Sequence, residues 1–158
     1  MSFWDRFRKQ DKPAPAAALS LPAIAARLQA ASASSRGVLR ADDLDAVSRE
    51  LGAPREQVYA ALAMSETTSL EAQHDLKFVV CTGNCRDRGA LLCVQRLLAI
   101  RDGRQAAGKS GFDIVPRQCL GRCQVGPAIE LATPDGTAVL ANATPAMIDQ
   151  ATSELFED

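Results

Sequence analysis

The spacing of the hydrophobic positions changes near residue 73. Before it, apolar residues recur about every three to four positions, which is typical of amphipathic helices. Three such sets of apolar residues occur, each next to a helix start or stop signal. Leu21, Ile24 and Leu28 follow Ser20, and Val58 and Leu62 follow Pro54. Leu44, Val47 and Leu51 lie between Asp42 or Asp43 and Gly52. Ser, Asp and Pro favour helix starts and Gly favours helix ends. The pattern predicts three short helices that pack as a small bundle.

After residue 73 the pattern predicts strands and helices in alternation. LKFVVC is a short apolar run typical of a buried strand, and residues 87–102 have the spacing of an apolar helix. FDIVPRQ, PAIELAT and TAVLA predict three more strands, and a Pro134-Asp135-Gly136 turn joins the last two. Thr144 and Pro145 predict the start of a closing helix. The order strand, helix, strand, hairpin, helix suits an α/β layer.

Three segments follow from this pattern. We expect a flexible N-terminal tail and Pro/Ala linker over 1–19, a helical domain over 20–72 and an α/β domain over 73–158. The first nine residues combine aromatic and basic side chains, which predicts either a docking peptide or a terminus without a role. No apolar run reaches the roughly 20 residues that cross a bilayer, and the N-terminus lacks a clear signal or transit pattern. We expect a cytoplasmic protein without a transmembrane segment, free or held at the inner face of a membrane through a complex.

Composition changes this picture little, but the distribution of charge adds to it. The chain is 47% hydrophobic and 23% charged, which is ordinary for a globular protein. Residues 77–122 carry nine Lys or Arg and three Asp, a net +6, whereas residues 123–158 carry six acids and no base. These segments either neutralise each other in the fold or leave a basic docking face. Nucleic acid is not an expected partner, because the single Trp and the single Tyr lie far from the basic residues.

Four of the five cysteines form two pairs with the same spacing. Cys81-Thr-Gly-Asn-Cys85 and Cys119-Leu-Gly-Arg-Cys123 each follow a predicted strand and contain one glycine. Thiolates are soft ligands that select zinc or an iron–sulfur core over hard cations. The spacing leaves both choices open, because structural zinc also takes four cysteines. A structural disulfide would need an oxidising compartment, and dithiol redox chemistry normally uses C-x-x-C.

The fifth cysteine and the only histidine do not extend this ligand set. Cys93 lies in the predicted helix in register with Leu97 and Ile100, so we expect it to be a small buried hydrophobic residue. His74 lies in a polar stretch without metal-ligand spacing, and we expect a loop residue. The chain also lacks a Rossmann glycine fingerprint, a P-loop and a recognisable flavin site. It is therefore not expected to oxidise NADH alone.

The cysteine segments resemble those of the thioredoxin-like [2Fe-2S] ferredoxins. The closest resemblance is to the small iron–sulfur subunit of the NADH dehydrogenase module of respiratory complex I; related subunits occur in NAD-linked hydrogenases and formate dehydrogenases. The matching text is VVCTGNCRDRGA, CLGRCQVGPAIEL and PDG followed by the Thr-Pro helix start. GVLRADDLDAVSRELGAPREQVYAAL is similar to the helical N-terminal domain of the complex subunits. The resemblance implies a thioredoxin-like [2Fe-2S] domain preceded by a small helical bundle.

This resemblance also implies a function for the chain. Cys81, Cys85, Cys119 and Cys123 would bind one [2Fe-2S] cluster, and the chain would pass single electrons to or from a flavin- and NAD(H)-binding subunit. Two features depart from the complex subunits, which usually have four residues inside the first cysteine pair and a Phe-Tyr pair where this chain has Met64-Ser65. A stand-alone ferredoxin and a zinc-stabilised interaction module are the alternatives.

Two arginines adjoin the predicted ligands. Arg122 lies between two of them and Arg86 follows another. An oxidised cluster with four thiolates carries a charge of about −2, and reduction adds one more negative charge. Nearby positive charge favours the reduced form, so we expect these arginines to raise the reduction potential or to serve docking. The parent complex, its substrate, the potential itself and the oligomeric state do not follow from the sequence.

Overall fold

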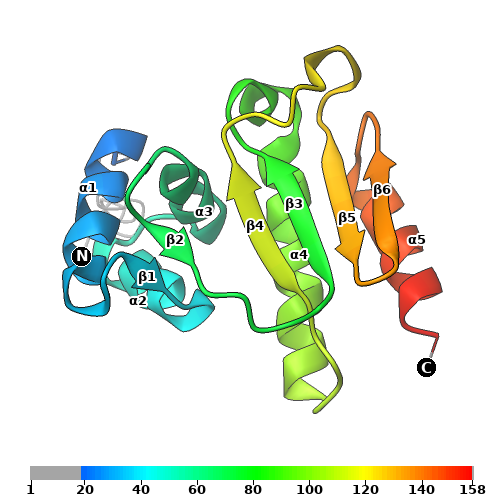
Figure 1. Cartoon of the computed structure of the whole chain (residues 1–158), viewed down its shortest axis with the longest axis horizontal. Coiled ribbons are helices and arrows are strands. Elements are labelled where there is room, and N and C mark those ends of the chain that lie inside the picture. Colours follow the sequence, from blue (N-terminus) through cyan, green and yellow to red (C-terminus); the bar gives the residue numbers. More distant parts are fainter. Residues whose placement is uncertain (1–18, 158) are drawn as a thin grey trace, which may run out of the picture.

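The computed structural model describes residues 19–157, so the expected tail lies outside it apart from Leu19. The first part of the chain contains helices α1 (Leu21–Ser32), α2 (Ala41–Leu51) and α3 (Arg55–Ala63). Two short strands, β1 (Val38–Leu39) and β2 (Ser69–Leu70), pair in parallel beside these helices (Figure 1). The three predicted helices are confirmed, whereas this small sheet was not expected from the sequence.

The ends of these helices follow the local signals with one exception. Ser20 caps α1, because its Oγ accepts a hydrogen bond from the Ala23 N–H at 3.3 Å. Gly52 ends α2 with a left-handed backbone, at φ 63°. The prediction that Asp42 or Asp43 precedes α2 as its cap was wrong. The helix starts earlier, and the Asp43 carboxylate reaches back from the first turn to accept the N–H of Arg40, the capping residue, at 2.8 Å.

The second part of the chain is a four-stranded sheet with two helices. Its elements are β3 (Lys77–Cys81), α4 (Ala90–Ala106), β4 (Asp113–Arg117), β5 (Ile129–Thr133), β6 (Gly136–Leu140) and α5 (Pro145–Leu155). The strand order is β4-β3-β5-β6, with β3 parallel to β4 and antiparallel to β5, and with β5 and β6 forming a hairpin. The helices α4 and α5 lie on one side of the sheet (Figure 1). The expected fold class is confirmed in its architecture: an α/β layer preceded by a small helical bundle.

The central helix α4 differs from its predicted bounds of 87–102. A 3-10 helix over Asn84–Arg88 comes first, and Gly89, at φ 104°, separates it from α4. A left-handed residue cannot continue a helix, so α4 starts at Ala90. It then runs past residue 102 to Ala106. The segment that carries the second cysteine is therefore a separate short element.

Strand register places alternate residues on the two sides of the sheet. Phe78 pairs with Ile114, and both side chains are fully buried in the core. The next pair along the strands, Val79 and Val115, lies on the opposite side, together with Glu130 of β5. Val115 and Glu130 are only partly buried. The core thus lies mainly between the sheet and α4, and the other side of the sheet is more open.

The helical part is joined to α4 by a polar network as well as by apolar packing. Arg55 of α3 donates to Asp45 at 2.9 Å and to Asp102 of α4 at 2.6 Å. Arg101, which is 9% exposed, donates to the Tyr59 hydroxyl at 2.6 Å. One continuous hydrophobic cluster includes residues from both parts. The boundary between 20–72 and 73–158 stays a prediction. In the described range, no helix is long and apolar enough to cross a membrane.

Candidate metal centre

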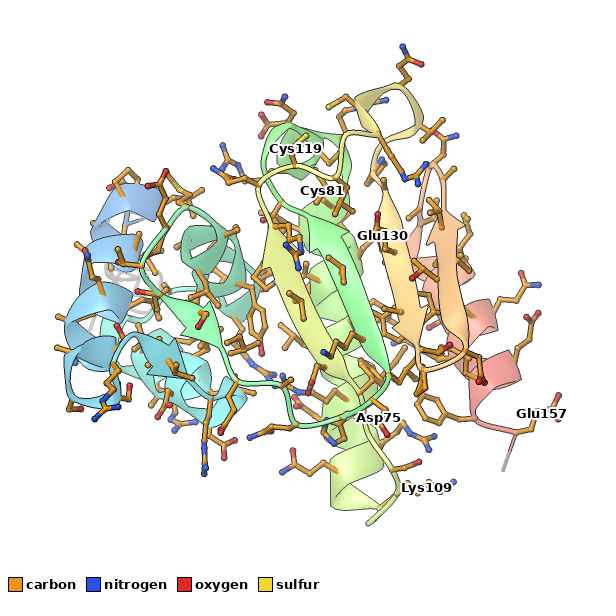
Figure 2. The ribbon with its side chains drawn as sticks, viewed as in Figure 1. Asp75, Cys81, Lys109, Cys119, Glu130 and Glu157 are labelled. Atoms are coloured by element: carbon orange, nitrogen blue, oxygen red, sulfur yellow. The ribbon has the colours of Figure 1, made fainter. Side chains whose placement is uncertain are left out.

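The sheet delivers both cysteine pairs to the same end of the molecule. β3 ends at Cys81, and the neighbouring parallel strand β4 ends at Arg117, which pairs with Cys81 in the register. Because parallel strands run in the same direction, the loops that follow them leave from the same edge. Figure 2 shows Cys81 and Cys119 together at this end, far from Lys109 and Asp75 at the other.

The two cysteine loops are in direct backbone contact. The N–H of Thr82 donates to the carbonyl of Arg117 at 2.8 Å, and the Cys81 thiol lies 3.6 Å from the carbonyl oxygen of Gln118. A Cβ atom added at Gly83 would lie 2.1 Å from that same oxygen. Only glycine permits this approach, so the glycine inside the first cysteine pair is needed for contact between the loops.

A third segment, residues 126–128, closes one side of this region. The N–H of Cys81 donates to the Ala128 carbonyl at 3.3 Å. A Cβ atom added at Gly126 would lie 2.7 Å from the Cys85 sulfur. The Arg88 guanidinium donates a hydrogen bond to the carbonyl of Cys123 and so links the first cysteine loop to the second. Backbone groups of three segments therefore surround the sulfur atoms.

The two pairs differ in burial. Cys81 is 2% exposed and Cys85 is 1% exposed, whereas Cys119 and Cys123 are both exposed. Burial raises the pKa of the Cys85 thiol, and Cys81 and Cys123 raise it further, while a hydrogen bond with the Ala128 backbone lowers it. Cys85 is thus electrostatically linked to thiols of both pairs. Cys119 accepts a hydrogen bond at its sulfur from the Gly121 N–H at 3.2 Å.

The structure brings the two loops together without a closed ligand shell. Within residues 19–157, no three Cys, His, Asp or Glu side chains are arranged closely enough to hold one metal ion. All five cysteines are free thiols. The four loop cysteines form an all-sulfur donor set, and the backbone N–H of Gly121 already donates to the Cys119 sulfur. Such hydrogen bonds are among the features that tune iron–sulfur clusters, so these residues fit a cluster.

The two arginines predicted to act on a cluster each lie near an acid. Arg122 Nε is 3.9 Å from the Glu130 carboxylate, and Arg86 Nε is 4.0 Å from the Asp87 carboxylate. These distances are at the long limit of ion pairs, and the side chains are partly exposed, so the pairing is weak. Both arginines flank the cysteine loops, and their effect on a potential or on docking stays a prediction.

Cys93 and His74 lie outside this region. Cys93 is fully buried in α4, its thiol faces the Ala143 carbonyl at 3.6 Å, and burial raises its pKa to about 11. The expectation of a small buried hydrophobic residue is confirmed. His74 is a loop residue, as expected, but its Nδ1 lies 2.9 Å from an oxygen of the buried Asp113 carboxylate.

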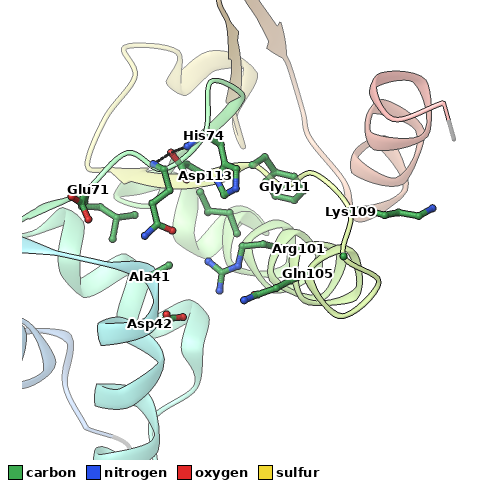
Figure 3. A pocket seen from close by; sticks show the side chains of 14 residues that line it. Ala41, Asp42, Glu71, His74, Arg101, Gln105, Lys109, Gly111 and Asp113 are labelled. Carbon is green, nitrogen blue, oxygen red and sulfur yellow. Dashed lines mark hydrogen bonds and ion pairs between the residues drawn. The ribbon is translucent and has the colours of Figure 1, made fainter.

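This His74–Asp113 pair borders a cavity that sequence reasoning did not find. The cavity has a volume of about 400 Å³ and lies between the helical part and the C-terminal end of α4. Figure 3 shows Arg101 and Gln105 of α4 on the side facing Asp42, with His74 and Asp113 above them. The other Asp113 oxygen accepts the backbone N–H groups of Gln73 and His74. Asp113 therefore fixes the connector between the two parts, and no sequence motif marks that role.

Solved structures similar to this chain exist, and one of them is a ferredoxin. No protein-family description matches the chain, and no curated protein matches it. The chain is similar to the crystal structure of the wild-type thioredoxin-like [2Fe-2S] ferredoxin from Aquifex aeolicus, with 21% identity and a TM-score of 0.43. The match covers 52% of this chain and 85% of that one.

Proposed function

We propose that this chain carries one [2Fe-2S] cluster on Cys81, Cys85, Cys119 and Cys123 and serves as an electron-transfer subunit. Its partner would be the flavin- and NAD(H)-binding subunit of an oxidoreductase complex. The family would be the thioredoxin-like [2Fe-2S] ferredoxins, and the small subunit of an NADH dehydrogenase module is the favoured member. NAD-linked hydrogenases and formate dehydrogenases offer equivalent complexes.

One observation carries this proposal. Two loops with the same Cys-x-x-x-Cys spacing leave neighbouring parallel strands at one edge of the sheet and touch through Gly83 and Gln118. The two loops therefore lie side by side, and the pKa of the Cys85 thiol is raised both by Cys81 of its own pair and by Cys123 of the other pair. Four thiolates in two pairs are the donor set that a [2Fe-2S] cluster takes.

The bound cluster would supply one-electron redox chemistry. The chain would hold it at a sheet edge, shield two of its four ligands from water and leave the other two near the surface. The backbone N–H of Gly121 would donate to the Cys119 sulfur and favour the more negative, reduced form. Because the described thiols do not form a closed shell, we expect the exposed loop to move when the cluster binds.

The partner is inferred from what the chain lacks and from its charge. The sequence has no recognisable nucleotide or flavin motif, so electrons must come from another protein or leave to one. The arginines Arg86, Arg88, Arg117 and Arg122 flank the cysteine loops. A cytoplasmic location, free or at the inner face of a membrane through the complex, accords with this role.

The test is an ultraviolet–visible spectrum of anaerobically purified protein before and after dithionite, with iron and sulfide assays. We expect a reddish-brown protein with about two irons and two sulfides per chain that bleaches on reduction. A colourless protein with about one zinc per chain would instead establish the zinc-stabilised interaction module.

A second experiment tests membership of a complex. A tagged chain isolated from its native cells should retain a flavin-containing, NAD(H)-binding subunit through gel filtration. Isolation as a brown monomer or homodimer that exchanges electrons rapidly with soluble donors would point to the stand-alone ferredoxin.

A further inference from the structure

We propose that the groove between β2 and β4, here termed the junction groove, binds a short extended segment of the electron partner that carries a carboxylate. The identity of this partner rests on the proposed function. The groove has a volume of about 580 Å³ and runs between the helical part and the sheet. Its walls include Ser69 and Leu70 of β2 and the chain from Val115 to Cys119. One of the exposed candidate ligands, Cys119, therefore lines it.

The charge of the groove indicates an anionic occupant. Among the described residues that line it, Arg117 is the one charged side chain. Arg117 is exposed, and its guanidinium forms no ion pair or hydrogen bond with any side chain in residues 19–157. The other polar lining groups are hydroxyls and the Gln118 amide. A guanidinium binds a carboxylate through two parallel hydrogen bonds, so an acidic residue of the partner suits this position.

Backbone groups of β2 face the groove and indicate an extended segment. The N–H of Ser69 donates to the Gly37 carbonyl at 2.8 Å, and the N–H of Glu71 donates to the Leu39 carbonyl at 2.7 Å. In a strand, hydrogen-bonding groups alternate between the two edges. The N–H and C=O of Leu70 therefore lie on the edge of β2 away from β1, and Leu70 lines this groove as well as the cavity beside Asp113. An extended segment can pair with both groups.

The facing strand β4 limits how long that segment can be. The N–H of Asp113 donates to the Leu76 carbonyl at 2.9 Å, and the Arg117 carbonyl accepts from Thr82 at 2.8 Å, so these alternate positions bond to the β3 side. Pro116 then falls on the outer edge and has no N–H to offer. A full strand cannot join β4, and β2 has only two residues. The groove accordingly fits a short segment.

Occupation of the groove would place the partner beside the cluster ligands. Gln118 and Cys119 are among the residues that line the groove. The Gln118 carbonyl also lies 3.6 Å from the Cys81 thiol. A bound segment would thus contact residues adjacent to both cysteine pairs. Electron tunnelling falls steeply with distance, so a docking site here would favour transfer.

The test is a titration of the full ¹⁵N-labelled chain with two capped peptides, acetyl-Ser-Val-Glu-Val-Ser-amide and its Gln counterpart, followed by NMR. We expect the Glu peptide to shift the amide signals of Ser69 and Leu70. We also expect it to bind about tenfold more tightly than the Gln peptide, a difference of about 1.4 kcal/mol. Equal binding of the two peptides, or no shift at these amides up to millimolar peptide, would overturn the proposal.

Two charge-reversed variants complete the experiment. Arg117→Glu should abolish the preference for the Glu peptide, whereas Arg49→Glu, on the exposed side of α2, should bind it as the wild type does. Equal loss in both variants, or shifts that depend on protein concentration without peptide, would assign the effect to general charge or to self-association. Iron content is measured on the same samples. If an iron-free zinc protein binds the peptide, the groove is a binding site but its occupant is not an electron partner. If the protein contains iron but does not bind the peptide, the proposed function stands and the groove proposal is wrong.

Discussion

The two cysteine pairs have the same spacing but opposite surroundings. The first pair continues a central strand into a 3-10 helix, and both of its thiols are buried. The second pair follows the edge strand β4 and also runs into a 3-10 helix, Cys123–Val125, but both of its thiols are exposed, and the Cys119 sulfur accepts a hydrogen bond from the Gly121 N–H. The spacing of residues therefore does not determine how firmly a ligand is held; the position of its strand in the sheet does.

This difference suggests a division of roles. The buried pair is fixed by core packing, so it should define where the cluster sits. The exposed pair can adjust to the cluster and to a partner, and it should tolerate more change. The predictions below probe this asymmetry, starting with the largest expected effect.

Replacement of single cysteines should give the largest difference between the two pairs, measured as the iron that each variant retains. We expect Cys85→Ser to lose nearly all bound iron, because the buried serine cannot shift to accommodate a changed bond. Cys119→Ser should keep a fraction of the cluster with an altered visible spectrum. Iron per chain and absorbance measure both, and Cys93→Ala serves as the control that keeps its iron. Equal loss in the two serine variants would show that burial does not distinguish the pairs.

Substitution of the glycine inside each pair should also cost more stability at the buried pair than at the exposed pair. An alanine Cβ at Gly83 would lie 2.1 Å from the Gln118 carbonyl oxygen, so Gly83→Ala should lower the free energy of unfolding by about 3 kcal/mol. Gly121 has φ 70° but nothing within 4 Å of an added Cβ. Gly121→Ala should therefore cost only about 1 kcal/mol of backbone strain. Chemical denaturation of both variants checks this, and a larger cost at Gly121 would contradict it.

A smaller effect is expected from charge at the exposed pair. Arg122→Ala removes a positive charge next to two ligands, so it should lower the reduction potential of the cluster. Glu130→Gln should raise it, because the Glu130 carboxylate lies 3.9 Å from Arg122 and offsets its charge. Redox titration followed by absorbance measures both. An unchanged or higher potential in Arg122→Ala would leave docking as the role of this arginine.

The smallest expected effect is on stability, from the ion pair between Arg55 of the helical part and Asp102 of α4. This effect should not depend on the cysteines. A hydrogen bond from Arg55 lowers the pKa of Asp102 below its ordinary value of 3.8. The stabilisation is therefore complete above pH 3.8 and is lost as the pH falls through the lower folded-state value. Asp102 is half-exposed, so Asp102→Asn should cost at most about 1 kcal/mol at pH 7. Thermal melts should show this difference narrowing toward pH 3, and a constant difference would exclude the ion pair as its cause.

Much of the architecture was predictable because it depends on neighbouring residues. Strand β3, the hairpin and the closing helix follow from short apolar runs and turn residues, and Thr144 caps α5 by accepting the Met147 N–H at 3.3 Å. The approach of the two cysteine loops follows from the parallel pairing of the strands that precede them. The strands, turns and helix require no knowledge of distant contacts, whereas the approach of the two loops depends on the pairing of β3 with β4.

Other features depend on contacts between residues far apart in the sequence. The two-residue strands β1 and β2 and the cavity beside Asp113 have no local signature. The unequal burial of the cysteine pairs was also not predictable, because identical spacing gave no reason to separate them. Burial is set by which strands lie at the edge of the sheet.

The contact between Arg101 and Tyr59 has a consequence for how such a chain can change over evolutionary time. If the helical segment were lost, the Arg101 guanidinium of α4 would lose its hydrogen-bond partner, the Tyr59 hydroxyl. Apolar surface of α4 that is now buried would become exposed to water. Gain or loss of the helical segment would therefore need compensating substitutions in α4. Relatives that lack the segment should have a different residue where this chain has Arg101.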